Sequence, residues 1–209
     1  MGHTRTIKKG QLVLYQGEAP PGAFLVKEGL VRALNMSSNG EEKTVALFAP
    51  GDYFPIGFIF DKSPVALFFY EAAFDSVIEV IDKAEFKSRL DRAAATDQLS
   101  SLATLYLSAL LQVNALGQTK AKDRIARIMQ FLCVRFGRSA ANDARIMISI
   151  PLTQLDIARM AGLTRETTAV ELNALKAMEI ITVRRKTYYV NLKKLLASMD
   201  DDDLSSVVL

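Results

Sequence analysis

Four consecutive residues in the C-terminal part of the chain carry side chains suited to contacts with nucleic acid. Arg165 can form two parallel hydrogen bonds with guanine O6 and N7 or neutralise a phosphate, and Glu166 can accept a hydrogen bond from cytosine N4. Thr164 and Thr167, with the free amides at the start of a helix, suit phosphate oxygens. This arrangement of Arg, Glu and Thr indicates recognition of bases and phosphates.

Two short helices joined by a glycine turn are predicted to position these residues, and such a pair is a helix-turn-helix. Thr153 is a suitable N-cap, and Asp156 supplies the acidic part of a capping box. Gly162 ends the first helix because glycine adopts the left-handed C′ conformation at little cost, and Thr164 caps a second helix over 164–178. The predicted buried positions are Leu155, Ile157, Ala158 and Ala161 in the first helix and Leu172, Leu175 and Met178 in the second.

A hairpin with a basic tip follows the two helices. Short strands at 180–183 and 188–191 flank Arg184-Arg185-Lys186-Thr187, so the hairpin is interpreted as the wing of a winged helix-turn-helix. The elements predicted before the first helix are a helix at 121–136, a loop at 139–143 and a strand at 145–150. The side chains expected to contact phosphates, which position a protein without specifying sequence, are Thr153, Gln154, Thr164, Thr167, Arg184, Arg185 and Lys186.

The tetrapeptide at 164–167, placed at the start of the second helix and followed by the wing, resembles the recognition helix of the bacterial Crp/Fnr transcription regulators, the cyclic-AMP receptor protein superfamily. The resemblance extends over nearly the whole chain and implies double-stranded DNA and RNA polymerase as partners. In the family an Arg usually follows four residues after the Glu as a third base reader, but Val170 occupies that position here. A valine can contact a thymine methyl but cannot read guanine, so a different half-site is expected, with Glu171 or Asn173 as further readers.

The charge distribution agrees with a DNA-binding second half. Residues 119–199 contain 15 Lys and Arg against 6 Asp and Glu, whereas residues 1–118 contain 11 against 13. The 209 residues, 50% of them hydrophobic, suffice for one large domain or two small ones. The single cysteine excludes an intramolecular disulfide, and no apolar run is long enough to span a membrane, so a cytoplasmic location is expected.

The first half shows short β-type segments separated by turn signals. The segments are 12–15, 24–26, 30–34, 44–48 and 77–81. By composition they predict only a small antiparallel all-β domain. The sequence segments 15–18, 26–31 and 50–53 resemble the turns of the cyclic-nucleotide-binding β-roll of the same family. The resemblance therefore implies an α+β chain with an N-terminal antiparallel β-roll over 1–90 and a winged helix-turn-helix over 119–199.

The effector site of the family is altered in this sequence. Cyclic-nucleotide-binding members have a Gly-Glu pair for the phosphate and ribose, and an Arg followed by Ser or Thr for the phosphate charge. In this sequence Pro55-Ile56 falls near the position of the Gly-Glu pair, and Ala66-Leu67 falls near that of the Arg pair. Proline has no amide hydrogen, isoleucine no carboxylate and alanine no positive charge. Cyclic nucleotides are therefore expected to bind poorly. Two alternatives remain, a filled apolar core or a reshaped pocket for an apolar or mixed small molecule. The candidate pocket residues are Phe54, Ile56, Phe58, Phe68 and Tyr70.

A long helix over 91–118 is predicted between the two halves, because this stretch is rich in Ala, Leu, Gln and Ser. An a/d heptad seam with spacings of three and four is formed by Leu99, Leu102, Tyr106, Ala109, Val113 and Leu116. An ordinary buried helix also shows such spacing, but the place of this helix resembles that of the family's dimerisation helix. A parallel homodimer is therefore expected. Residues 200–209 form an acidic tail, interpreted as solubilising.

Other functions find less support in the sequence. An architectural DNA-coating protein with little sequence preference is the main alternative. An enzyme is not expected, since there is no glycine-rich phosphate loop and no recognisable carboxylate pair. No cofactor or metal is expected, because Cys133 is a lone cysteine interpreted as a core residue and His3, the single histidine, lies at a terminus expected to be mobile. The effector, the operator, the regulated genes and the sign of regulation do not follow from the sequence.

Overall fold

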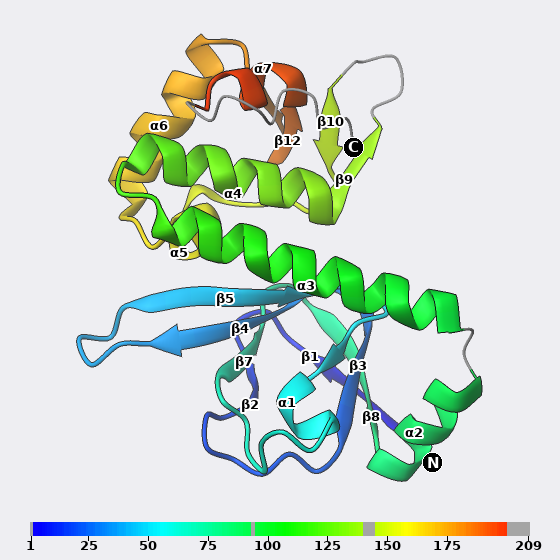
Figure 1. Ribbon diagram of the computed structural model, residues 1–209. Helices are drawn as coiled ribbons and strands as arrows, with labels where there is room; N and C mark the ends of the chain where they lie inside the picture. The colour runs from blue at the N-terminus through cyan, green and yellow to red at the C-terminus, as the bar shows by residue number, and fades with distance from the viewer. Residues whose placement is uncertain (1, 93–94, 140–144, 200–209) are drawn as a thin grey trace. The chain divides into compact units, whose positions relative to one another are not determined.

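The computed structural model describes residues 2–92, 95–139 and 145–199, and the chain divides into two compact units, Met1–Ala103 and Thr104–Leu209. The strands of the first unit are β1 (His3–Ile7), β2 (Leu12–Leu14), β3 (Ala23–Glu28), β4 (Val31–Met36), β5 (Glu42–Phe48), β6 (Tyr53–Phe54), β7 (Phe69–Ala72) and β8 (Ser76–Ile81) (Figure 1). Two helices accompany them, α1 (Ile56–Ile59) and α2 (Lys83–Arg92). The strands form two four-stranded antiparallel sheets, in the orders β1-β8-β3-β6 and β2-β7-β4-β5.

A column of aromatic rings fills the space between the two sheets. Phe54 stacks on Phe24 with ring centroids 5.1 Å apart and on Tyr70 at the same distance, and Phe48 lies 5.3 Å from Phe54. All four side chains are buried, and rings packed in this way contribute strongly to the stability of a core. The turn between β3 and β4 requires Gly29, whose φ is +85° and where a Cβ would overlap Ser76.

The first unit has more regular structure than the sequence predicted. The terminal residues expected to be mobile form strand β1, in which His3 pairs with Val80 of β8, so that expectation was wrong. The short strands β6 and β7 and the helices α1 and α2 were not predicted. Alternating apolar residues are few in β1, which explains why periodicity did not reveal it. The β-strands that were predicted are all present, with each end within two residues of the expected bound.

The long helix differs from its predicted bounds at the N-terminal end. Asp91 and Arg92 end α2, and the long helix is α3 (Ala95–Gly117), which runs from the first unit into the second. The prediction of one helix from Asp91 was therefore wrong, since two helices occupy this stretch. Helix α2 is fastened to the roll by Arg89, which donates to Glu79 and Glu85 at 2.6 Å each. The contact with Glu79 joins α2 to strand β8.

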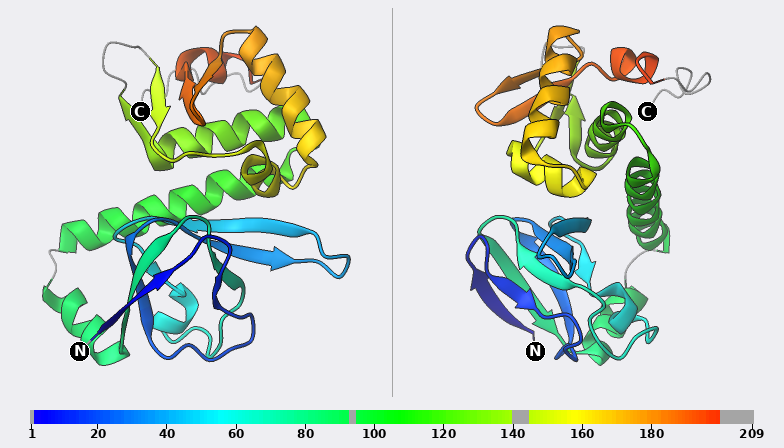
Figure 2. Two further views of the ribbon diagram at one scale, coloured as in Figure 1. Left: turned by 180° about the vertical axis from the view of Figure 1, so that it is seen from behind. Right: turned by 90° about the vertical axis from the view of Figure 1, so that its left-hand side faces the viewer.

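The remainder of the second unit, over its described residues, contains four helices and a small four-stranded sheet. It consists of α4 (Ala121–Phe136), β9 (Gly137–Ser139), β10 (Ile146–Ile148), α5 (Gln154–Ala161), α6 (Arg165–Ala177), β11 (Ile181–Arg184), β12 (Thr187–Val190) and α7 (Leu192–Ala197). The sheet order is β11-β12-β10-β9, so the predicted strand before the first helix is present as β10 and pairs with β12 of the wing hairpin. Figure 2 shows α6 and the hairpin β11–β12 from two further directions.

Three details of this unit correct the sequence interpretation. Leu155 is 45% exposed and Met160 takes its place in the core of α5. Met178 is also 45% exposed and forms the C-cap of α6, outside the apolar edge made by Leu172 and Leu175. Ser139 belongs to strand β9 and not to a loop, while residues 140–143 and the tail 200–209 lie outside the described residues.

Two general properties complete the description of the fold. Among the described residues, no helix has the length and apolar character needed to cross a membrane, and no group of three or more His, Cys, Asp and Glu side chains forms a metal-binding arrangement. Cys133 is 5% exposed in α4, and burial raises the pKa of its thiol to about 12. It is a core residue with little thiolate at neutral pH.

Candidate functional site

Each helix of the helix-turn-helix begins with a threonine side-chain cap, and a left-handed glycine ends the first helix. The Thr153 hydroxyl accepts from the Asp156 amide at 3.2 Å, and the Thr153 amide donates to the Asp156 carboxylate at 2.8 Å, which completes the predicted capping box. Gly162 ends α5 in the left-handed conformation with φ 60°. The Thr164 hydroxyl then accepts from the amide of Thr167 at 3.1 Å and so begins α6.

Arg124 stabilises the same turn from α4, a role that the sequence interpretation missed. Its Nη1 lies 3.4 Å from the carbonyl oxygens of Ala161 and Gly162, and its Nε donates to the carbonyl of Gln118 at 2.8 Å. A cation at the C-terminal carbonyls of a helix is favourable because these carbonyls carry partial negative charge. Nothing in the local sequence around Arg124 signals this contact, since its partners lie 37 and 38 residues away.

Helix α6 separates its buried and exposed residues cleanly. Thr168, Leu172 and Leu175 are buried in the unit. Glu166, Val170 and Asn173 are exposed and follow one another at helical spacing, so they share the opposite face. Val170 is 65% exposed, a high value for an apolar side chain in the middle of a helix. This face presents one carboxylate, one methyl pair and one amide at the positions that could meet base edges.

The remaining predicted readers differ in how they are placed. Arg165 is exposed at the first turn of α6, beside the capping residue Thr164. Glu171 is half-buried on the flank of the exposed face and is less available than predicted. Asn173 accepts a hydrogen bond from Lys176 at 3.2 Å, which adds a positive charge next to the amide. Of the expected base readers, the structure therefore brings Glu166, Val170 and Asn173 onto one surface, with Arg165 at its N-terminal edge.

The wing ends in a two-residue turn made of basic residues. Arg184 pairs with Thr187 across the hairpin, which leaves Arg185 and Lys186 as the connecting residues. Their φ values are 49° and 67°, so both occupy the left-handed region that favours Gly and Asn. All three basic side chains of the tip are exposed, and the Arg184 guanidinium lies 5.5 Å from the ring centre of Tyr189. The tip therefore exposes positive charge, and the backbone of Arg185 and Lys186 is strained because neither residue is Gly or Asn.

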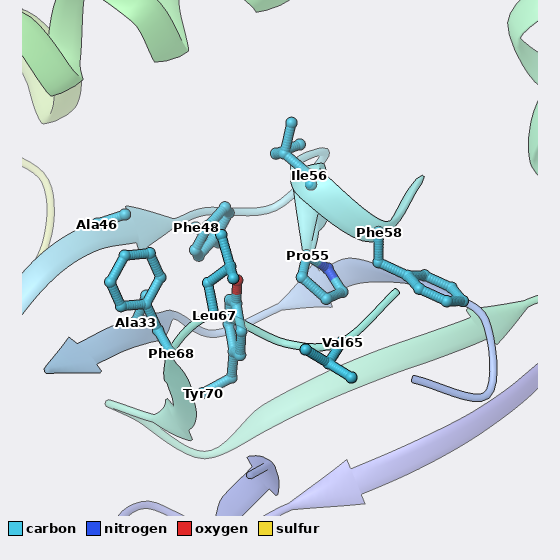
Figure 3. A pocket seen from close by; sticks show the side chains of 11 residues that line it. Ala33, Ala46, Phe48, Pro55, Ile56, Phe58, Val65, Leu67, Phe68 and Tyr70 are labelled. Carbon is cyan, nitrogen blue, oxygen red and sulfur yellow. The ribbon is translucent and has the colours of Figure 1, made fainter. Parts of the chain in front are cut away.

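A second candidate site is a pocket in the first unit, shown in Figure 3. Its volume is about 160 Å³. The lining residues come from β4, β5, α1 with its N-cap, β7 and the segment that leads into β7, and they are Ala33, Ala46, Phe48, Pro55, Ile56, Gly57, Phe58, Val65, Leu67, Phe68 and Tyr70. None of these side chains carries a charge. Leu67 is 53% exposed, so the pocket reaches the surface near this residue.

The predicted pocket residues are largely those that line the cavity. Ile56, Phe58, Phe68 and Tyr70 line it, whereas Phe54 does not, because its ring is fully buried in the aromatic column. The prediction for Phe54 was therefore wrong, since the side chains of a strand alternate and that of Phe54 faces the core. Of the four residues near the altered effector positions, Pro55, Ile56 and Leu67 line the pocket, while Ala66 is buried behind it.

Tyr70 supplies the polar atom of this cavity. It is 4% exposed, its oxygen points in among the labelled lining side chains of Figure 3, and its hydroxyl has no hydrogen-bonding partner among the described residues. Burial raises the pKa of the Tyr70 hydroxyl to about 12, so it stays protonated at neutral pH.

Helix α1 closes one side of the pocket and is tied to α2. The Phe58 ring lies 3.9 Å below the Lys83 ammonium, and Lys83 also forms an ion pair with Asp61. Lys83 is the first residue of α2, so the wall of the pocket and the helix that precedes α3 share this contact. Lys83 was not singled out from the sequence, because its partners are 22 and 25 positions away.

The predicted seam residues of α3 are mostly exposed in the single chain. Leu99 and Tyr106 are each 68% exposed, Val113 is 67% exposed and Leu102 is 47% exposed. Ala109 is exposed as well, and Leu116 is half-buried. Large apolar side chains repeated along one side of a helix and open to solvent are typical of a surface that associates with another protein surface.

Comparisons with known proteins agree with both halves of this architecture. Residues 4–93 match the cyclic nucleotide-binding domain family and residues 123–198 match the Crp-like helix-turn-helix domain family. The nitrogen fixation regulation protein FixK of Rhizobium meliloti (strain 1021) is 26% identical over 179 residues, which cover 86% of this chain and 78% of FixK. The cyclic AMP receptor protein of Thermus thermophilus is 26% identical over 200 residues, covering 92% of this chain and 85% of that protein.

A solved structure supports the same fold over almost the full length. FixK2 from Bradyrhizobium japonicum superimposes with a TM-score of 0.75 at 20% sequence identity, and the match covers 94% of this chain and 96% of FixK2. The order of the two matched domains, the helix-turn-helix geometry and these relatives agree with one another. The chain therefore belongs to the Crp/Fnr transcription regulators, with a cyclic nucleotide-binding domain followed by a DNA-binding Crp-like helix-turn-helix domain.

Proposed function

We propose that this protein is a homodimeric, sequence-specific regulator that inserts α6 of each protomer into the major groove of a roughly palindromic site. The observation that carries the proposal is the exposed face of α6. Glu166, Val170 and Asn173 project from it at helical spacing, while Thr168 and Leu172 hold the opposite side in the core. A helix anchored in this way can offer its free side chains to base edges without losing its own packing.

The roles of the individual side chains follow from their chemistry. Arg165 would bind guanine or a phosphate, Glu166 would accept from cytosine, and Val170 would contact a thymine methyl. Thr167 and the basic wing tip would contact phosphates, together with Thr153 and Gln154 at the start of α5. These phosphate contacts position the protein, whereas the face of α6 supplies the sequence preference.

The dimer would form through the exposed seam of α3. A parallel pair of these helices would bury Leu99, Leu102, Tyr106 and Val113, the apolar residues that the single chain leaves open. Two-fold symmetry would then place two copies of α6 on half-sites about 34 Å apart. RNA polymerase would be the further partner of the DNA-bound dimer.

The effector of this regulator is proposed to be a molecule other than cyclic AMP. Pro55 supplies no amide hydrogen, Ile56 no carboxylate and Ala66 no cation, and no described lining residue of the pocket is charged. An anionic cyclic phosphate placed there would lose its hydration without gaining a counter-charge, which costs several kcal/mol.

Selection of random duplex DNA by the purified full-length protein, followed by sequencing, tests the proposed function. Enrichment of a palindrome with two half-sites about one helical turn apart is the expected result. A matched selection with Glu166→Gln should change the base preference within each half-site while the half-site spacing stays the same.

An architectural DNA-coating protein would give a different result. It would enrich no site, and its affinity would fall steeply with salt at every sequence tested. That outcome would refute sequence-specific recognition and favour the architectural alternative.

A further inference from the structure

We infer that the pocket in the β-roll binds a neutral molecule of about one six-membered ring that accepts a hydrogen bond from the Tyr70 hydroxyl. The inference deepens the proposed function and rests on it in one respect, the view that this pocket is the effector site.

The volume of the pocket limits the size of the ligand. The cavity measures about 160 Å³. An apolar protein cavity of about 150 Å³ is known to bind benzene, so the present pocket accommodates one ring with a small substituent. A cyclic nucleotide consists of a purine, a ribose and a cyclic phosphate, and these three groups together are larger than this space.

The lining determines the charge of the ligand. The walls are formed by side chains such as Phe48, Phe58 and Val65, and none of the described lining residues is ionisable at neutral pH. Lys83, which contacts the ring of Phe58, directs its ammonium to the Asp61 carboxylate. A charged ligand would therefore lose its hydration without a partner, whereas a neutral ring gains contact with Phe and aliphatic surfaces.

The Tyr70 hydroxyl determines where the polar group of the ligand lies. This side chain is 4% exposed, and its hydroxyl has no hydrogen-bonding partner among the described residues. A hydroxyl that opens into an apolar pocket can complete its hydrogen bonding with a water molecule or with a polar atom of a ligand. Since the phenol of Tyr70 remains protonated at neutral pH, it donates, and the ligand must offer an oxygen or nitrogen acceptor.

The test uses phenol as the probe, because phenol is one neutral ring with one oxygen. Binding to the full-length, DNA-free protein is measured by ligand-observed nuclear magnetic resonance in a titration at pH 7. For a ligand with so few non-hydrogen atoms, a Kd of about 0.1 to 1 mM is expected. Toluene, which has the same ring without an acceptor, should bind about five- to tenfold more weakly. Benzoate and cyclic AMP should show no competition with phenol at equal concentration.

Two variants locate the binding in this pocket. Tyr70→Phe keeps the ring and loses no hydrogen bond within the protein, so it should fold normally and bind phenol about as weakly as toluene. Ala46→Leu adds three carbons to a half-buried lining position and should abolish phenol binding. A urea midpoint for each variant close to that of the parent protein excludes a loss of binding through unfolding.

Several results would overturn the inference. Phenol binding that is unchanged in Ala46→Leu would place the ligand elsewhere, and equal binding of phenol by Tyr70→Phe would refute the hydrogen bond from Tyr70 to the ligand. Binding of benzoate as tight as that of phenol would contradict the neutral class. Because DNA is absent from these measurements, a failure of sequence-specific DNA binding would be seen separately, in the DNA selection.

Discussion

The strained tip of the wing allows its two roles, charge presentation and chain reversal, to be separated by substitution. Arg185 and Lys186 both have positive φ in a two-residue hairpin turn, a place where Asn-Gly is favoured. A non-glycine residue costs about 1 kcal/mol or more in the left-handed region, and Gly pays no such penalty while Asn pays little. The double variant Arg185→Asn with Lys186→Gly should therefore raise the free energy of unfolding by about 1 to 2 kcal/mol.

The same variant should weaken DNA binding, because it removes two positive charges from each protomer. Each phosphate contact contributes about 0.9 to the slope of log affinity against log salt concentration, so the loss of two contacts should reduce the slope by about 1.8 per protomer. The hydrogen bond from the Leu152 amide to the carbonyl of Lys186 uses backbone atoms and remains available in the variant. The wing should therefore keep its position on the domain. The stability of the protein should rise while its affinity for DNA falls.

A matched control keeps the strain and removes only the charge. In Arg185→Gln with Lys186→Gln, the salt slope should fall as in the first variant, but the urea midpoint should stay near that of the parent protein. Stability is followed by urea denaturation and affinity by titration of a fluorescent duplex at three salt concentrations. If the Asn-Gly variant were no more stable than the Gln-Gln variant, the assignment of strain would be refuted. An unchanged salt slope in both variants would refute the phosphate contacts.

Three further predictions concern base reading, association and pH. Val170→Arg should shift the selected half-site toward guanine by about 1 to 3 kcal/mol of discrimination, and an unaltered selected site would show that Val170 does not face a base. Tyr106→Glu combined with Ala109→Glu should give monomers by light scattering, and an intact dimer would refute the α3 seam. The unfolded chain releases the Tyr70 proton near pH 10, whereas burial holds the pKa of the folded hydroxyl at about 12, so stability should fall between these values as pH rises. In urea denaturation at pH 9 to 11, Tyr70→Phe should make the fall of the free energy of unfolding with pH shallower. An equal slope in the variant and the parent protein would contradict the burial of Tyr70. Cys133, whose pKa is also raised by burial, accounts for part of the slope that remains in the variant.

The helix-turn-helix could be predicted closely because its signals are local. A capping box spans three residues, and a left-handed glycine ends a helix through its own backbone, so Thr153 and Gly162 reveal their roles without knowledge of distant contacts. The hairpin tip and the amphipathic pattern of α6 are also local. The same reasoning failed for Leu155 and Met178, because spacing alone does not say how wide the buried stripe of a short helix is.

The β-roll was predicted less completely, since antiparallel pairing joins residues that are far apart in the chain. Strand β1 pairs with β8, which lies about seventy residues later in the chain, and the composition of β1 does not indicate this partner. Helix α2 contacts the sheet through the ion pair between Arg89 and Glu79 of β8 and through packing of Phe86 against Tyr53. Such contacts exist only after the sheets have formed.

The two sites show the same division between local and long-range information. The sequence by itself determined the predictions of the DNA-facing residues, of the heptad seam and of an altered phosphate cassette at Pro55-Ile56, because each prediction depends on which side chains are present at short spacing. Only the tertiary structure decided that Phe54 turns into the core while Tyr70 directs a hydroxyl into a cavity of about 160 Å³. Only the tertiary structure placed Arg124 on the turn and Lys83 on Phe58. The physical reason is that the shape of a cavity and the partner of a long side chain depend on the packing of segments that are distant in sequence.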